Sequence, residues 1–75
     1  MHMVGLSQQD REKMGRKFKE IRERKELTQV ELARKAEINS NYYAKIERGE
    51  ATPRIDIINK IIKALEINCS EILPL

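Results

Sequence analysis

The signal that opens a helix recurs along this chain at short intervals. Thr28 and Glu31 form a capping box, and Leu27 before the cap can close over the first turn as a hydrophobic staple. Comparable caps stand at Asn39 and Asn68, each preceded by isoleucine. Starts this close together leave room only for short helices, and no alternating strand pattern competes with them.

These signals predict an all-α, compact five-helix bundle that occupies residues 1–75 as a single domain, with residues 1–6 as a flexible N-terminus. Charged residues make up 36% of the chain and aromatic residues 4%, a composition typical of helical bundles. Thr52 and Pro53 predict a cap and a first helical residue for the fourth helix. The expected helices are, in order, about Ser7–Lys25, Gln29–Ala36, Ser40–Arg48, Pro53–Leu65 and a last short helix opened by Asn68.

Composition also limits the classes of function. A single cysteine excludes an internal disulfide, and the Cys/His spacing of a zinc site is absent, so we expect no metal and no cofactor. The chain lacks a glycine-rich phosphate loop and any histidine–carboxylate set with catalytic spacing, which argues against an enzyme and a small-molecule substrate. No apolar run is long enough for a membrane span, which favours the cytoplasm. The net charge of +3 is compatible with nucleic acid but does not require it.

The second and third expected helices are joined by only about three residues. Such a joint forces the helices to cross sharply, which is the geometry of a helix-turn-helix unit, here at about residues 28–49. In that unit the first turn of the second helix meets base edges in the major groove. This turn holds Ser40, Asn41 and Tyr42, none of them a strong helix former. The three residues are either base-reading groups or ordinary solvated side chains.

From about Phe18 to Leu73 the chain resembles the phage repressor and Cro-like (XRE-type) helix-turn-helix domains. The landmarks, in order, are Thr28-Gln29-x-x-Leu32-Ala33, Ile38-Asn39, Lys45-Ile46-Glu47-Arg48-Gly49, Pro53, Ala64-Leu65 and Glu71-Ile72-Leu73. Tyr42 and the Leu65-Glu66-Ile67 joint look most like the controller proteins of restriction–modification systems. The resemblance implies a sequence-specific transcriptional regulator that binds double-stranded DNA at a palindromic operator as a homodimer. An antitoxin, or another module whose main partner is a protein, is the alternative.

The resemblance also implies roles for individual residues. The base-reading residues would be Ser40, Asn41, Tyr42 and Lys45. The phosphate-binding residues would be Gln29, Asn39 and Arg54, and Gln29 would also brace the recognition helix. Arg22 and Glu47 match a pair that forms an internal salt bridge, and Tyr43 takes the place of an aliphatic core residue. Asparagine suits a bidentate contact with adenine, and an exposed tyrosine can contact a thymine methyl group or a phosphate.

Three glutamates depart from the family pattern. Glu26, Glu37 and Glu66 stand at helix ends where family members commonly have glycine, which accepts a left-handed conformation without steric cost. Any other residue in that conformation costs about 1–2 kcal/mol. We therefore expect either an adjusted backbone or tolerated strain at these joints.

The fourth expected helix carries more isoleucine than one buried face needs. Its main stripe is Ile55, Ile58, Ile62 and Leu65, and further isoleucines widen the stripe beyond what a core-facing helix requires. The surplus is covered either by the last helix or by a second subunit. We expect a homodimer interface that contains Ile57, Ile61, Ile72 and Leu75.

Overall fold

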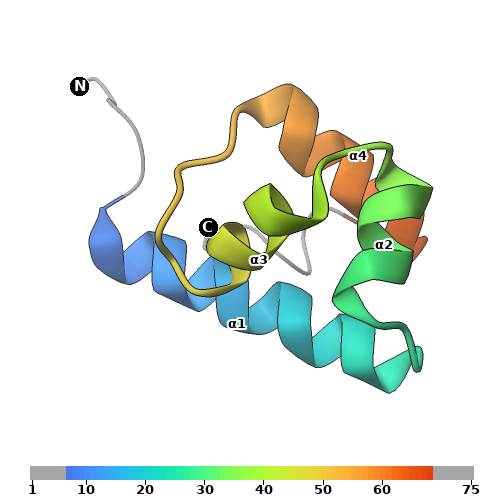
Figure 1. The fold of residues 1–75 in the computed structure, drawn as a ribbon. Helices are drawn as coiled ribbons and strands as arrows, with labels where there is room; N and C mark the ends of the chain where they lie inside the picture. The colour runs from blue at the N-terminus through green and yellow to red at the C-terminus, as the bar shows by residue number, and fades with distance from the viewer. Residues whose placement is uncertain (1–6, 69–75) are drawn as a thin grey trace.

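The computed structural model describes residues 7–68, in which every regular element is a helix. The elements are α1 (Gln8–Arg24), α2 (Gln29–Ala36), α3 (Ser40–Glu47) and α4 (Ile55–Leu65) (Figure 1). The all-α prediction is confirmed over this range. The predicted fifth helix beyond Asn68 and the predicted flexible residues 1–6 lie outside the described residues. Within residues 7–68, none of the helices has the length and apolar character of a membrane span.

The helices pack around one core to which all four contribute. α3 contacts both α1 and α2, and α2 also packs against α4. The fully buried side chains include Phe18 of α1, Leu32 of α2, Tyr43 of α3 and Ile61 of α4. Tyr43 therefore occupies a core position, as predicted. This arrangement holds α2 and α3 across one another and fixes the direction in which α3 points.

Two helices begin with the side-chain caps that the sequence predicts, and α1 begins with a further cap at Ser7. The Thr28 hydroxyl accepts a hydrogen bond from the backbone N–H of Glu31 at 3.0 Å, and the Glu31 carboxylate accepts one from the backbone N–H of Thr28 at 2.8 Å. Asn39 Oδ1 accepts from the backbone N–H of Tyr42 at 2.9 Å, and the Ser7 hydroxyl caps α1 in the same way. Local signals thus place the starts of α1, α2 and α3.

The start of α4 differs from the prediction. Arg54 is the N-cap residue, its side chain makes no capping hydrogen bond, and the helix begins at Ile55. The prediction of Thr52 as cap and Pro53 as the first helical residue is therefore wrong. Pro53 is buried in the non-helical segment before α4. Because Pro53 is buried in this non-helical segment, α4 begins only after it, at Ile55.

Every helix in residues 7–68 ends in the same backbone motif, with one left-handed residue after the last turn. The left-handed residues are Glu26, Glu37, Gly49 and Glu66, with φ of 58°, 60°, 75° and 59°. The residue after each of them donates its N–H to a carbonyl in the preceding helix; the pairs are Leu27 to Arg22, Ile38 to Ala33, Glu50 to Lys45 and Ile67 to Ile62. The three glutamates thus hold the strained conformation rather than an adjusted one.

Apolar contacts offset part of this strain. Leu27, Ile38 and Ile67 each follow a left-handed glutamate, and all three are partly buried against the core. Such a contact accompanies this type of helix end and is gained only when the chain turns back there. Gly49 is the exception, because its successor Glu50 is exposed. Gly49 also leaves no room for a side chain, since a Cβ there would lie 2.6 Å from Glu12 Cγ.

Two predictions for α4 need correction. Ile55 is 64% exposed because it precedes the part of α4 that packs on the core, where Ile58, Ile61, Ile62 and Leu65 are buried. Ile61 is fully buried inside a single chain, so its predicted place in a dimer interface is wrong. Ile57 is only partly buried beside this stripe. The other two predicted interface residues, Ile72 and Leu75, lie outside the described residues.

Relief of the left-handed strain should be measurable at Glu37. Glycine adopts φ of 60° freely, so Glu37→Gly should raise the free energy of unfolding by about 1 kcal/mol, after allowance for the looser unfolded chain. Urea denaturation measures the change. Glu20→Gly is the control, because it places glycine inside α1 and should destabilise by about 1 kcal/mol. Destabilisation by both changes would show that strain at Glu37 is not significant.

Candidate nucleic-acid interface

The first turn of α3 lies at the surface and is separate from the part of the helix that is buried. Asn41 and Lys45 are exposed, and Ser40 and Tyr42 are half-buried. Asn41 and Lys45 are four positions apart, so they share one face of the helix. The buried residues of α3 are Tyr43, Ile46 and Glu47, in its later part. The helix is therefore anchored by these three residues, and its exposed face presents Asn41 and Lys45.

A buried ion pair fixes this anchored half. Arg22 Nε lies 2.6 Å from Glu47 Oε2 and Arg22 NH2 lies 3.1 Å from Oε1, a bidentate contact between α1 and α3. The side chains are only 9% and 2% exposed. Arg22 NH1 also donates to the Leu27 carbonyl at 2.7 Å, which ties the α1–α2 connection to the same group. The ion pair that the resemblance implies is present in the structure.

Gln29 completes this network from the start of α2. Its Nε2 donates to Glu47 Oε1 at 2.9 Å. The carboxylate of Glu47 therefore accepts hydrogen bonds from both α1 and α2, which sets the crossing of α2 and α3. The bracing role of Gln29 matches this geometry. Its contact with a phosphate stays a prediction.

The surroundings of Glu47 favour its ionised form. Burial acts to raise the pKa of Glu47, but the hydrogen bonds from Arg22 and Gln29 outweigh burial and hold that pKa below the ordinary 4.5. Burial also raises the pKa of Tyr43, and the neighbouring Glu47 carboxylate raises it further. The Tyr43 hydroxyl is buried without a hydrogen-bond partner among the described residues. At neutral pH the centre of the domain therefore holds one arginine cation, one carboxylate and a neutral tyrosine.

α1 approaches α3 closely beside this pair. A Cβ added to Gly15 would lie 2.4 Å from the Glu47 carbonyl oxygen and 2.5 Å from that of Ile46. Both atoms are backbone, so they cannot move aside without a shift of α3. Only glycine allows the two helices to approach here, and the position of Glu47 relative to α1 depends on this approach.

The predicted phosphate contacts are spread over three segments. Gln29 begins α2, Asn39 uses its Oδ1 to cap α3, and Arg54 precedes α4. The Arg54 side chain is 82% exposed, and its Nε lies 3.4 Å from Asp56 Oδ1. Gln29 is half-buried, whereas Asn39 and Arg54 are exposed. The three residues flank the first turn of α3 in the sequence, and their contact with phosphate stays a prediction.

Sequence reasoning missed one polar contact next to this surface. Arg48 donates through Nε and NH2 to the two carboxylate oxygens of Glu50, each at 3.1 Å. The two residues lie in the turn that follows α3. The same spacing, an arginine followed two residues later by an acid, recurs at Arg54 and Asp56. The spacing does not single out the pair, because Arg24 and Glu26 share it while Arg24 pairs with Glu20.

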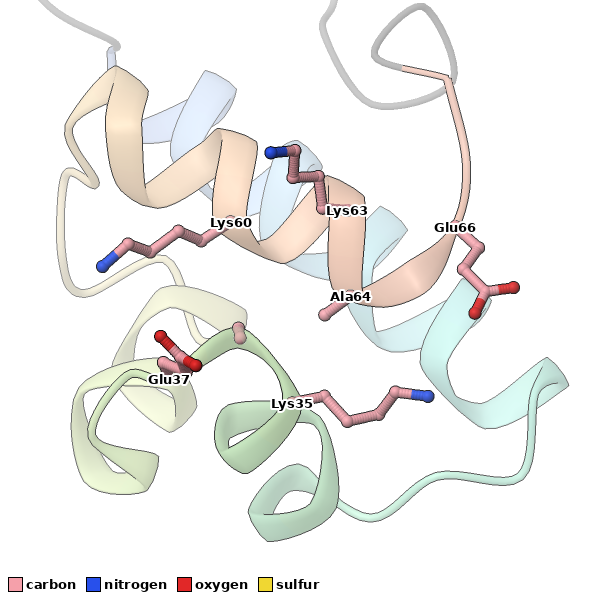
Figure 2. A pocket seen from close by; sticks show the side chains of 7 residues that line it. Lys35, Glu37, Lys60, Lys63, Ala64 and Glu66 are labelled. Carbon is pink, nitrogen blue, oxygen red and sulfur yellow. The ribbon is translucent and has the colours of Figure 1, made fainter.

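A groove lies between the end of α2 and α4. Figure 2 shows its lining by three lysines, Lys35, Lys60 and Lys63, and by Glu37 and Glu66. The three lysine side chains point in different directions and do not converge on one point. Among residues 7–68 there is also no group of three or more side chains suited to hold a metal ion.

Two short helices joined at a three-residue turn, with an exposed polar first turn on the second, define a helix-turn-helix domain. The helix-turn-helix family pattern matches residues 18–72. The chain belongs to this family, in its phage repressor and Cro-like branch. This is a family of DNA-binding regulators, and the resemblance seen in the sequence is confirmed.

Particular relatives support the assignment. The immunity repressor protein of Bacillus phage phi105 is 39% identical over 59 residues, which are 79% of this chain and 41% of the repressor. The restriction-modification controller protein C.AhdI from Aeromonas hydrophila has a TM-score of 0.85 and 31% identity, over 87% of this chain and 98% of C.AhdI. The controller protein C.Esp1396I bound to a 25 base pair operator site has a TM-score of 0.74 and 32% identity, over 79% of this chain and 78% of that chain. The chain thus spans about two fifths of the phage repressor but nearly the whole of C.AhdI.

The buried ion pair should show strong coupling in a double-mutant cycle. Glu47→Ala leaves Arg22 buried without its carboxylate and should lower the free energy of unfolding by about 3 kcal/mol. The double change of Arg22 and Glu47 to alanine should cost less than the sum of the single changes. The exposed Lys17–Glu20 pair of α1 is the control, with coupling close to zero in the same urea measurement. Additive losses at Arg22 and Glu47 would mean that the two side chains do not interact.

The lowered pKa of Glu47 predicts a dependence of stability on pH. A carboxylate whose pKa is lower in the folded state stabilises above its unfolded pKa, and this stability is lost as pH falls through the folded value. The free energy of unfolding should therefore decrease as pH falls below about 4.5. The Glu47→Gln variant should show a shallower decrease in denaturation series from pH 7 to pH 3. Parallel curves for the two proteins would show that Glu47 does not contribute to the loss of stability at low pH.

Proposed function

We propose that this chain is a sequence-specific regulator of transcription that binds double-stranded DNA in the major groove. One observation carries the proposal: Asn41 in the first turn of α3 is exposed, while a buried ion pair holds Glu47 at the end of the same helix against α1 and α2. A rigid support is what base reading requires, since hydrogen bonds to base edges have narrow geometry. No structural need of the fold accounts for Ser40 and Asn41.

The proposed contacts divide into two kinds. Asn41 reads a base edge, with adenine as its best partner, and Ser40, Tyr42 and Lys45 extend the reading surface along α3. Gln29, Asn39 and Arg54 hold the phosphate backbone on either side. Phosphate contacts position the domain without reading sequence, so the two groups have different experimental signatures.

The proposed complex is a homodimer on an operator with two-fold symmetry. C.Esp1396I, which shares the fold and 32% of the sequence, has been solved as a tetramer in complex with its natural 35 base-pair operator. In this chain the dimer would use the flank of α4 that contains Ile57, together with Ile72 and Leu75. Two recognition helices related by a two-fold axis read half-sites about 34 Å apart, one turn of the DNA helix.

Variants of a base-reading residue and of a phosphate-binding residue should lose DNA affinity in different ways. Asn41→Ala should weaken binding to the operator by about 1–3 kcal/mol and leave binding to a scrambled duplex nearly unchanged. Arg54→Ala should weaken binding to both duplexes and reduce the salt slope by about one unit for each subunit. Fluorescence titration at several salt concentrations separates the two.

Arg54→Ala serves as the matched control for Asn41→Ala, because both side chains are exposed and neither is part of the core. Equal loss on both duplexes for Asn41→Ala would remove Asn41 from the base-reading set. Absence of any difference between operator and scrambled duplex in the unaltered chain would favour a protein-interaction module instead.

A further inference from the structure

The turn between α3 and α4 carries a cation and an anion that neutralise each other. Arg48 and Glu50 form a bidentate pair, with both contacts at 3.1 Å, although the side chains are 53% and 56% exposed. The backbone on both sides of the pair is fixed, because the Arg48 N–H donates to the Ala44 carbonyl and the Glu50 N–H to the Lys45 carbonyl. The backbone of both residues is therefore held in place next to the end of α3.

Positive charge acts on the Glu50 carboxylate. The hydrogen bond from Arg48 lowers the pKa of Glu50, and the positive charges of Arg48 and Lys45 lower it further. The carboxylate is consequently ionised at neutral pH and lies within the field of two cations. The other helix ends of residues 7–68 place an apolar residue at the corresponding position, namely Leu27, Ile38 or Ile67. Packing therefore gives no reason for glutamate at position 50.

We propose that Glu50 is an internal counter-ion that competes with DNA phosphate for Arg48, and so weakens the binding of the domain to DNA of any sequence. The proposal rests on the proposed DNA-binding function. A carboxylate and a phosphate offer the same bidentate acceptor geometry to a guanidinium group. A phosphate that approaches the turn must displace Glu50 from Arg48 and is repelled by the displaced charge.

The size of the effect follows from counter-ion release. One additional phosphate contact steepens the dependence of log K on log salt by about 0.9 for duplex DNA. If the added contact is purely electrostatic, this slope corresponds to about eightfold tighter binding at 0.1 M salt for each subunit. Glu50→Gln should release Arg48 and produce this gain. Because phosphates carry no sequence information, the gain should be similar on the operator and on a duplex of random sequence.

The test titrates a random-sequence duplex and a selected operator at several salt concentrations. Glu20→Gln is the matched control, because Glu20 is an exposed carboxylate of α1 that also pairs with cations, Lys17 and Arg24. It changes the net charge equally but lies outside the proposed contacts. The double variant Arg48→Ala, Glu50→Gln should lose most of the gain. Thermal unfolding checks that every variant is folded.

A gain of several-fold with a steeper salt slope for Glu50→Gln, and a much smaller gain for Glu20→Gln, supports the proposal. Equal gains for the two variants would assign the effect to net charge alone and overturn it. A gain confined to the operator would also overturn it, since Glu50 would then act on base recognition. If the unaltered chain binds neither duplex, the proposed DNA-binding function itself fails. If the unaltered chain binds DNA but Glu50→Gln brings no gain, only the proposal for Glu50 fails.

Discussion

The bidentate ion pair between Arg22 and Glu47 is the interaction on which the rest of this domain depends. It joins α1 to α3, and through Leu27 and Gln29 it also includes the α1–α2 connection and the start of α2. A buried pair of charges is not in itself a strong source of stability, because desolvation offsets much of the attraction. Its directional hydrogen bonds instead specify one relative position of three helices. Gly15 makes that position possible, since any larger residue would separate α1 from α3.

This anchoring explains why the first turn of α3 is free to be polar. The core holds α3 through Tyr43, Ile46 and Glu47, and the Asn39 cap supplies the hydrogen bond that starts the helix. Ser40 and Asn41 are thus outside the buried core, and their positions are set by the other residues of α3. The recognition surface and its support are separate sets of side chains on one short helix. Changes at Asn41 and Lys45, which are exposed, should consequently cost little stability.

Much of this organisation is predictable from the sequence because it is local. Capping boxes, the glutamates at glycine-like joints and the short α2–α3 turn depend on residues a few positions apart, and the structure has them where the sequence places them. The start of α4 differs from the sequence prediction because burial of Pro53, a tertiary effect, overrides the preference of proline for the first helical turn. Ile61 was assigned to an interface because helical periodicity shows the width of an apolar face but not how much of it one chain covers. The Arg48–Glu50 pair is not predictable from helical spacing, because residues two apart do not meet on a helix. The left-handed turn at Gly49 brings the two side chains together.

Selection of binding sites from a pool of random duplexes, followed by sequencing, tests whether α3 reads DNA sequence as one half of a symmetric pair. If it does, selection should enrich a two-fold symmetric sequence whose half-sites are separated by about one helical turn, roughly 10 base pairs. A pool that stays random after repeated selection at moderate salt would contradict it.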